Sequence, residues 1–273
     1  MSPPAERDHE GIMWQRGIWD RYPAIYQREV DKRFVPVVQQ VIRRAALAPG
    51  QNVLDLGTGT GLVALQAAAL VAPHGDVLAV DLSPAMLAAA QQRAQAMDVR
   101  NIQFREGRAE AIPTDDGAVH VVLASLSLMY AIDRTVAARE IARVLRPEGR
   151  FVAAVWAGPE QCDIVLFQQT AGRFAPPPPV AGVGPGALAD PTPFLQQLAA
   201  AGIIAHVETE TLGFDYENFD LAWTVLADTT AADLAPARQQ EAREAVKALM
   251  WPHGDGPRHF RNVTQFIVGQ RRH

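Results

Sequence analysis

Between residues 52 and 156, short uninterrupted apolar runs alternate with longer helix-forming segments, and this alternation limits the fold more than any other feature. Uninterrupted apolar strands are typical of a parallel sheet, because helices cover both of its faces. Right-handed crossovers between such strands give a doubly wound, Rossmann-like α/β sheet. We expect strands at 52–56, 76–80, 101–106, 119–124 and 150–156, and helices at 62–71, 83–97 and 133–145.

Helical segments and two further strands flank this region. Residues 1–48 are expected to form an N-terminal helical lid that stops at Pro49-Gly50. Two more strands complete a seven-stranded, mostly parallel sheet. Inserts beyond the strand ends lie where α/β folds bind their ligands. We expect the two strands at 205–214 and 262–268, the main domain at 49–273, and the inserts at about 158–193 and 216–260.

Composition narrows the classes of protein that this chain can be. Its 273 residues are 48% apolar and 20% charged, as in an ordinary globular protein. A net charge of -5 predicts no nucleic-acid partner. The single cysteine, Cys162, excludes a disulfide scaffold, and we expect no bound metal. We also expect no membrane span and no signal peptide, and therefore a cytoplasmic protein.

A glycine-rich loop follows the first strand of the alternating region, in the segment Val53-Leu-Asp-Leu-Gly-Thr-Gly-Thr-Gly61. Glycines allow a backbone to adopt positive φ and to approach a ligand closely. The dinucleotide-binding fingerprint requires glycine or alanine where Leu62 stands, which disfavours a nicotinamide-dependent dehydrogenase. Asp55, two residues before the first glycine, would repel a pyrophosphate but attract an ammonium group.

A second carboxylate, Asp81, stands at the tip of the next strand. An acid at this place in such folds accepts hydrogen bonds from ribose hydroxyls. Together with Asp55, it predicts a ligand that has a ribose, a cationic amino-acid end and no phosphate. S-adenosylmethionine has these three features.

Three motifs carry a resemblance to a known family. They are Asp55-Leu-Gly-Thr-Gly-Thr-Gly61, Val80-Asp-Leu-Ser-Pro-Ala-Met-Leu87 and Ala142-Arg-Val-Leu-Arg-Pro-Glu-Gly-Arg150. In these motifs the chain resembles the class I S-adenosylmethionine-dependent methyltransferases, especially the small-molecule branch with the ubiquinone and menaquinone methyltransferases. The resemblance is strong over 50–156 and weak through the last two strands. It implies S-adenosylmethionine as the cofactor and S-adenosylhomocysteine as the product.

The resemblance also implies which residues contact the cofactor. Asp55 would face the ammonium group, directly or through water, and Asp81 would bind the ribose diol. Ser125 would lie below the methyl group and the methionine chain. The whole implied set is Asp55, Gly57, Thr58, Gly59, Gly61, Asp81, Leu82, Met86, Arg108, Ala109, Glu110 and Ser125.

One of these residues departs from the family pattern. The family usually has aspartate where Arg108 stands, and that aspartate accepts a hydrogen bond from the adenine amino group. Arginine has no acceptor atom. Adenine recognition must therefore use a backbone group, a water molecule or another side chain.

Aromatic residues near the N-terminus and two histidines near the C-terminus are further candidates. Trp19, Tyr22 and Tyr26 share one helical face, which either packs on the domain or covers the cofactor as a lid. Trp14 lies one turn earlier and could join them. A histidine is an effective general base near neutral pH, so His253 and His259 are candidate catalytic residues. Tyr22 is the third candidate for this role. The alternative for each histidine is a solvated loop residue.

These features predict transfer of a methyl group to an O, N, S or C atom of a small, partly apolar molecule. The N-terminal aromatics and the two inserts would line the acceptor pocket, the inserts through Phe167, Phe174, Phe219, Trp223 and Trp251. The sequence leaves open whether the protein forms a homodimer. Two alternatives also stay open: a cofactor-binding fold that catalyses a non-methylating reaction, and a non-enzymatic binding module.

Overall fold

Seven strands form one sheet in the order β3-β2-β1-β4-β5-β7-β6. The computed structural model describes residues 4–273, without the side chains of residues 4–7 and 228. The strands are β1 (Val53–Leu56), β2 (Val77–Asp81), β3 (Ile102–Glu106), β4 (Val119–Ser125), β5 (Leu145–Trp156), β6 (Ile203–Tyr216) and β7 (Arg258–Arg271). All neighbouring strands pair in parallel except β7, which runs antiparallel to β5 and to β6. The predicted doubly wound, mostly parallel sheet is confirmed.

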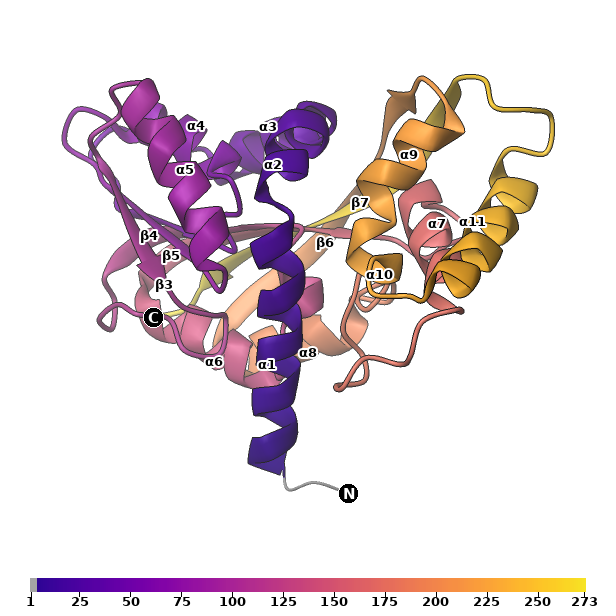
Figure 1. Cartoon of the computed structure of the whole chain (residues 1–273). Helices are drawn as coiled ribbons and strands as arrows, with labels where there is room; N and C mark the ends of the chain where they lie inside the picture. Colours follow the sequence, from indigo (N-terminus) through magenta and orange to yellow (C-terminus); the bar gives the residue numbers. More distant parts are fainter. Residues whose placement is uncertain (1–3) are drawn as a thin grey trace.

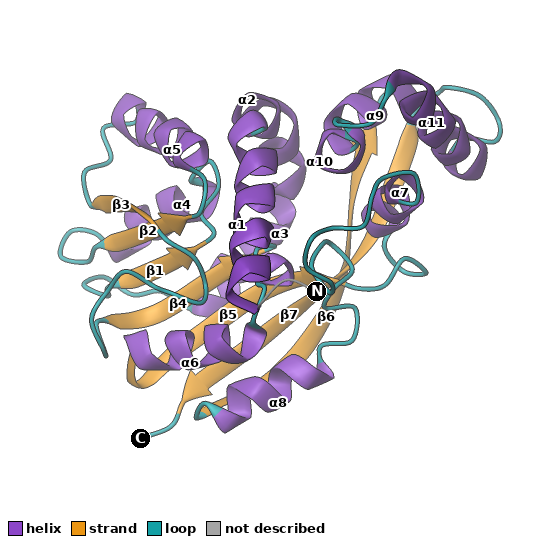
Figure 2. Cartoon of the chain, turned by 60° about the horizontal axis from the view of Figure 1, so that its bottom comes forward, coloured by secondary structure: helices purple, strands orange, loops and turns teal. Residues whose placement is uncertain are grey.

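Helices cover both faces of this sheet (Figure 2). One face carries α3 (Asp31–Ala45), α4 (Leu62–Val71) and α5 (Pro84–Ala96), and the other carries α6 (Arg134–Val144) and α8 (Thr192–Ala200). The central strands lie between these layers, and the side chains of β1 are buried throughout. Burial on both faces explains why the strands have continuous apolar sequences.

Local sequence signals set the ends of the helices beside the site. Gly61 precedes α4 with a φ of +84°, a left-handed conformation that glycine adopts without strain. Ser83 is the N-cap of α5, because its hydroxyl accepts a hydrogen bond from the Met86 amide at 3.1 Å. Both helices therefore begin at the same edge of the sheet, just after β1 and β2.

The N-terminal helices cross this edge (Figure 1). They are α1 (Pro4–Arg21), the short α2 (Pro23–Ile25) and the π-helical turn η1 (Tyr26–Val30), which continues into α3. Helix α3 packs on the sheet and buries Val37, Val38 and Val41. Helix α1 lies instead across the ends of the strands.

The second half of the chain adds a helical group at the far end of the β6–β7 hairpin (Figure 1). It comprises α7 (Asp163–Gly172), α9 (Phe219–Leu226), α10 (Asp228–Ala231) and α11 (Pro236–Met250). Its aromatic side chains pack on one another: the Phe219 and Trp251 rings are 5.2 Å apart, and Phe167 lies 6.1 Å from Trp223. No helix in the described residues is long and apolar enough to cross a membrane.

Candidate functional site

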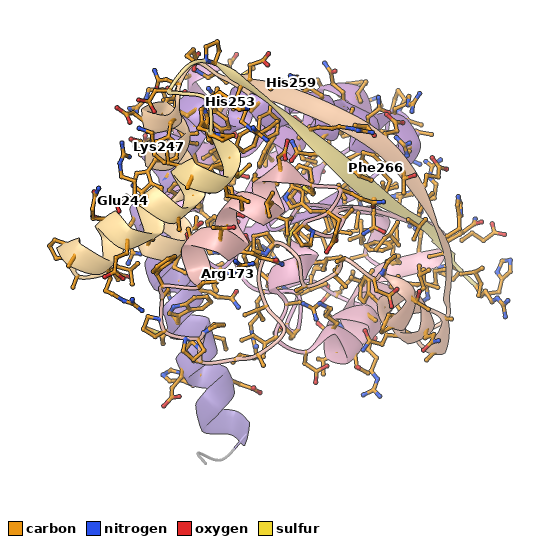
Figure 3. The ribbon with its side chains drawn as sticks, turned by 90° about the vertical axis from the view of Figure 1, so that its right-hand side faces the viewer. Arg173, Glu244, Lys247, His253, His259 and Phe266 are labelled. Atoms are coloured by element: carbon orange, nitrogen blue, oxygen red, sulfur yellow. The ribbon has the colours of Figure 1, made fainter. Side chains whose placement is uncertain are left out.

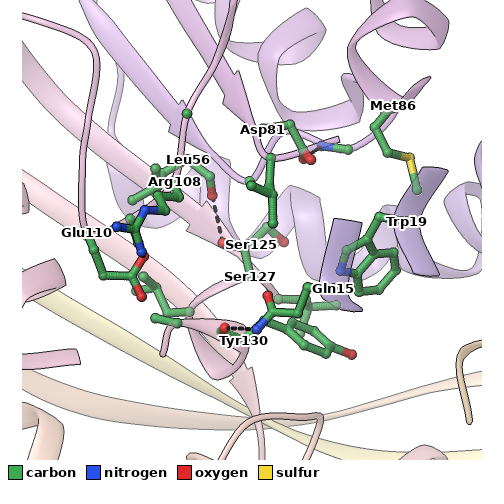
Figure 4. A pocket seen from close by; sticks show the side chains of 18 of the residues that line it. Gln15, Trp19, Leu56, Asp81, Met86, Arg108, Glu110, Ser125, Ser127 and Tyr130 are labelled. Atoms are coloured by element: carbon green, nitrogen blue, oxygen red, sulfur yellow. Dashed lines mark hydrogen bonds and ion pairs between the residues drawn. The ribbon is translucent and has the colours of Figure 1, made fainter. Parts of the chain in front are cut away.

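A cavity lies at the carboxyl ends of β1, β2 and β4, beneath α1 (Figure 4). Each neighbouring loop of the sheet contributes to it, as does the short η2 (Leu128–Tyr130). The lining residues are Gln15, Trp19, Tyr26, Leu56, Gly57, Gly59, Asp81, Leu82, Met86, Gly107, Arg108, Ala109, Glu110, Ser125, Leu126, Ser127, Leu128, Tyr130 and Ala131. This is the edge at which α/β folds bind their ligands.

The glycine loop is held tightly against its neighbours. Gly57 has a φ of +76°, and a Cβ atom there would lie 2.3 Å from the Cβ of Ser127. The Gly57 and Thr58 amides donate to the Val80 carbonyl at 2.8 and 2.9 Å. The Ser127 hydroxyl donates to the Leu56 carbonyl at 2.6 Å. The loop therefore needs glycine here, and its backbone lines the cavity.

Asp81 joins this loop to the start of α5. One carboxylate oxygen accepts from the Gly59 amide at 2.8 Å, and the other accepts from the Ser83 amide at 2.9 Å. Burial raises the pKa of Asp81, and these amide donors oppose the rise. A carboxylate has about four acceptor positions, so this one can also accept from a diol in the cavity.

Asp55 lies beneath the loop and is 1% exposed. Its Oδ2 accepts from the Thr58 hydroxyl at 2.7 Å, whereas its Oδ1 is buried and has no partner among the described residues. Burial raises the pKa of Asp55 to about 7, although hydrogen bonds from Thr58 and the Ala64 amide act against it. A buried acceptor without a partner is costly, and a cationic group on the cavity side of the loop would offset part of that cost through its attraction to the carboxylate.

The aromatic residues of the N-terminal helices divide into two roles. Trp19 and Tyr26 line the cavity, and Trp19 makes an edge-to-face contact with Tyr130 at 5.1 Å. Tyr22 is buried but does not line it, and its hydroxyl donates to the Val225 carbonyl of α9. Trp14 is 36% exposed and does not join the lining group.

Three side chains of α1 fix this helix over the cavity. Gln15 donates to the Tyr130 carbonyl at 2.9 Å. Arg16 forms an ion pair with Glu106 at 3.0 Å, and Asp20 accepts from the Ser83 hydroxyl at 2.6 Å. Gln15 was not predicted; it lies one helical turn before Trp19, and this spacing is the only signal in the sequence.

A second, smaller cavity shares residues with the first. Tyr26, Gly57, Gly59, Ser125 and Leu126 border both. Burial, followed by nearby carboxylates, raises the pKa of Tyr26 well above its usual value. Its hydroxyl therefore stays protonated near neutral pH and can donate a hydrogen bond.

The three candidate bases do not line either cavity. His253 and His259 lie near the end of α11 and the start of β7, at the far end of the hairpin (Figure 3). The Nδ1 atom of His259 is 2.7 Å from the Asp215 carboxylate, and this pair is exposed. Tyr22 faces α9. None of the three therefore lines the cavity, although the Tyr22 ring packs against Trp19 and Tyr26 with centroids 6.1 and 5.7 Å apart.

Most of the implied cofactor residues do meet at the cavity. Asp55, Thr58 and Gly61 are the exceptions, since they lie behind the loop and support it. Residues of the two inserts do not line the cavity, contrary to expectation, because their aromatic side chains pack on one another. No three His, Cys, Asp or Glu side chains in the described part of the chain are grouped to hold a metal ion.

Comparisons with known proteins agree with this architecture. The family described as "Methyltransferase domain" matches residues 53–149. The arsenite methyltransferase of Halobacterium salinarum is 39% identical over 106 residues, which are 39% of this chain and 27% of that protein. A ubiquinone/menaquinone biosynthesis C-methyltransferase of Rubrivivax gelatinosus is 36% identical over 121 residues, 44% of this chain and 45% of that one. The chain spans about half or less of the length of these relatives.

A solved structure shows the same fold. The YcgJ protein of Bacillus subtilis superposes with a TM-score of 0.63 and 20% identity, covering 86% of this chain and 98% of that one. The sheet order, the glycine loop and the carboxylate at the tip of β2 define a Rossmann-like methyltransferase fold. Residues 53–149 thus match a methyltransferase domain, and the fold is that of the class I S-adenosylmethionine-dependent methyltransferases. The cofactor of this family is S-adenosylmethionine.

Proposed function

We propose that this protein transfers the methyl group of S-adenosylmethionine to an O, N, S or C atom of a small, partly apolar molecule. The observation that carries the proposal is the pair of carboxylates around the glycine loop. Asp81 lies in the cavity wall, and Asp55 lies beneath the loop with one oxygen unpaired. The first suits a ribose diol and the second an ammonium group.

The residues of the cavity fit this cofactor from end to end. Asp81 would accept from the ribose hydroxyls, and the backbone of Gly57 and Gly59 would lie along the methionine chain, above Asp55. Ser125 would lie beneath the methyl group. When bound, S-adenosylmethionine supplies an electrophilic methyl group on a sulfonium that leaves as a neutral thioether.

The protein's own contribution is to align the reactants and exclude water. Holding two reactants in line contributes about 7–11 kcal/mol to lowering the barrier. Gln15, Arg16 and Asp20 hold α1 across the cavity, so the reactants would meet away from bulk water.

The acceptor side is aromatic and apolar. Trp19, Tyr26 and Tyr130 contribute rings, and Leu126 and Leu128 contribute aliphatic surface. Small-molecule pockets typically combine such surfaces with a few polar groups, which here include the hydroxyls of the two tyrosines. Aromatic faces also stabilise a cation such as a sulfonium.

The inserts support this arrangement from behind. Tyr22 of α1–α2 binds the Val225 carbonyl, and Arg21 forms an ion pair with Asp233 at 3.1 Å. Arg134 donates to the Gly182 carbonyl at 2.6 Å. The inserts therefore position the lid and the loop after β4.

The proposal is tested with S-adenosylmethionine that carries a trideuterated methyl group. The purified protein is incubated with acceptors grouped by reacting atom: phenols, carboxylic acids, amines, thiols and acidic carbon compounds. Mass spectrometry then follows the labelled product and S-adenosylhomocysteine together. We expect the labelled product and S-adenosylhomocysteine to form in equal amounts with one group of acceptors. In the Asp81→Ala variant, both products should decrease to the same extent.

Two other outcomes would contradict methyl transfer. Conversion of a compound in the presence of cofactor, without S-adenosylhomocysteine, would indicate a non-methylating reaction in the same cavity. Cofactor binding without conversion of any compound in a broad metabolite extract would favour the binding module.

A further inference from the structure

Three neighbouring aromatic side chains border the cavity, and we call them the aromatic wall: Trp19, Tyr26 and Tyr130. The Tyr130 ring stands at 89° to the Trp19 ring, with centroids 5.1 Å apart. The Tyr26 ring stands at 80° to the Trp19 ring, at 6.4 Å. The wall thus presents aromatic surface from more than one direction. Groups of aromatic rings bind alkylated ammonium ions, because the ring faces attract a cation.

Gln15 places a hydrogen-bond acceptor beside the aromatic wall. Its Nε2 atom donates to the Tyr130 carbonyl at 2.9 Å. A carbonyl only accepts, so this bond fixes which end of the amide carries the nitrogen. Figure 4 shows the amide oxygen turned away from the bond. Gln15 lines the cavity, and its oxygen has no hydrogen-bond partner among the described residues, so a bound molecule can donate to it.

The side chains of the aromatic wall are not general bases. Burial raises the pKa of Tyr130 above its usual value, and the pKa of Tyr26 is raised in the same way. Both phenols therefore stay protonated near neutral pH. The described residues that line the two cavities also include no histidine, lysine or cysteine.

The carboxylates that line the cavities are engaged with other groups of the protein. Asp31 forms an ion pair with Arg93 at 2.7 Å. Asp81 accepts from two backbone amides. Glu110 accepts from two backbone amides through one oxygen, and its other oxygen is 3.8 Å from Arg108. Arg108 is the one cation among the described lining residues, so these residues offer an acceptor neither a free base nor an unpaired positive charge.

An acceptor that loses no proton during the transfer suits such a site. A hydroxyl, a thiol or an acidic carbon becomes strongly nucleophilic only when a base removes its proton. A neutral amine needs no base, because its nitrogen already carries a lone pair. Burial and the charge of the nearby sulfonium both disfavour the protonated amine, so the neutral form would enter the cavity.

The bonds and charges of this step balance without a further reactant. The nitrogen lone pair attacks the methyl carbon and a C–N bond forms. The C–S bond breaks, and its electron pair stays on the sulfur, which becomes a neutral thioether. The positive charge moves to the nitrogen, where the ring faces would stabilise it. The alkylammonium product gives its proton to water after it leaves the cavity.

We propose that the acceptor is a primary or secondary amine, which Gln15 orients through its carbonyl oxygen and whose methylated ammonium product the aromatic wall stabilises. This inference rests on the proposed function and narrows its acceptor atom to nitrogen. A thioether would also react without a base and give a cation, but it has no N–H group to donate to Gln15.

The first test compares acceptors that share a skeleton and differ in the reacting atom. Alkyl, benzyl and indolyl compounds that carry an amine, a hydroxyl, a thiol or a methyl sulfide are incubated with the protein and trideuterated S-adenosylmethionine. Mass spectrometry follows the labelled products, and the rates without protein are subtracted. A general base contributes about 10²–10⁴-fold to a rate, so amines should react at least about tenfold faster than hydroxyls and thiols.

The outcomes of this test separate the inference from the proposed function. Equal or faster transfer to a hydroxyl, a thiol or a sulfide overturns the inference and leaves methyl transfer intact. Transfer to none of the compounds, although S-adenosylmethionine binds, contradicts the proposed function as well.

The second test measures binding instead of activity. Choline and its uncharged carbon isostere, 3,3-dimethylbutanol, are titrated into protein saturated with S-adenosylhomocysteine. The variants are Trp19→Leu and the matched control Trp14→Leu, since Trp14 lies on the same helix but does not line the cavity. Tyr130→Leu takes the place of Trp19→Leu if that variant does not fold.

We expect the wild type and Trp14→Leu to prefer choline by about tenfold or more. In Trp19→Leu this preference should be at least about threefold smaller. A wild type that does not prefer choline overturns the inference. A preference that is the same in Trp19→Leu and in the wild type also overturns it, because the aromatic wall would then not recognise the cation.

Discussion

Cofactor binding should release a proton from Asp55. Burial raises the pKa of this carboxyl to about 7, with a smaller contribution from the neighbouring Asp81 carboxylate. Only the ionised form attracts an ammonium group strongly, so binding must lower that pKa. At pH 6, one unit below it, roughly nine-tenths of the Asp55 population is protonated. Nearly one proton should therefore leave per ligand bound, and affinity should fall about fivefold between pH 7 and pH 6.

The assay is isothermal titration with S-adenosylhomocysteine at pH 6, in buffers that differ in ionisation enthalpy. An α-amino group has a pKa near 8, so the ligand's own ammonium is almost fully charged at this pH. The control variant is Asp55→Asn, whose amide oxygen can still accept from Thr58 and from the Ala64 amide. The number of protons released should be larger in the wild type by nearly one. Equal proton counts, or a wild-type affinity that is the same at pH 6 and pH 7, would refute the reasoning.

The same pKa predicts a pH dependence of stability. The folded-state pKa of Asp55 is raised from 3.8 to about 7, so the folded protein holds this proton more tightly than the unfolded chain. Its contribution is complete below about pH 4 and is lost as the pH rises to about 7, by up to about 4 kcal/mol. Urea unfolding of the unliganded protein should therefore show Asp55→Asn gaining stability relative to the wild type between pH 5 and pH 8. A constant difference across this range would contradict the assignment.

Three further predictions use variants of the cavity and its lid. Asp81→Asn removes the negative charge and turns an amide NH2 group toward one of the two backbone donors. Titration should therefore show S-adenosylhomocysteine binding weaker by about 1.5–3 kcal/mol. An unchanged dissociation constant in the folded variant would remove the ribose assignment. Gly57→Ala should lower the free energy of unfolding by more than about 2 kcal/mol. Gly50 also has a positive φ but lies in open space, so Gly50→Ala should lower it by about 1 kcal/mol. Equal losses in the two variants would count against the tight fit of the loop. Tyr26→Phe should slow methyl transfer in stopped assays with little loss of stability. Tyr22→Phe should lower the free energy of urea unfolding by about 1 kcal/mol and keep its activity. The reverse pattern would assign the catalytic contribution to Tyr22 and the structural one to Tyr26.

The fold was predictable where local and tertiary signals agree. The helix expected at 62–71 coincides with α4, because glycines precede it and its own alanine-rich side chains are largely buried. The strand expected at 150–156 begins earlier, at Leu145, since α6 runs directly into β5 and Leu145 pairs with Val119. Where a strand begins depends on which residues of the neighbouring strand pair with it, and a single sequence does not show this pairing.

The candidate site was predictable where it is local in sequence. The glycine loop, Asp81 and the turn with Glu110 each follow a strand, so the parallel sheet brings them to one edge. Gln15 and Tyr130 are 115 positions apart, and their hydrogen bond depends on how α1 crosses the strands. The aromatic residues of the inserts were assigned to the cavity from composition alone, which does not distinguish a ligand-facing ring from one packed on its neighbours.

The most direct test of the central claim is titration of the purified, cofactor-stripped protein with S-adenosylmethionine and S-adenosylhomocysteine, with NAD as the control ligand. The structure predicts micromolar binding of both sulfur compounds, no binding of NAD, and a weaker affinity for both sulfur compounds in Asp81→Asn. Binding of NAD in their place, or of none of the three, would contradict the assignment of this cavity to S-adenosylmethionine.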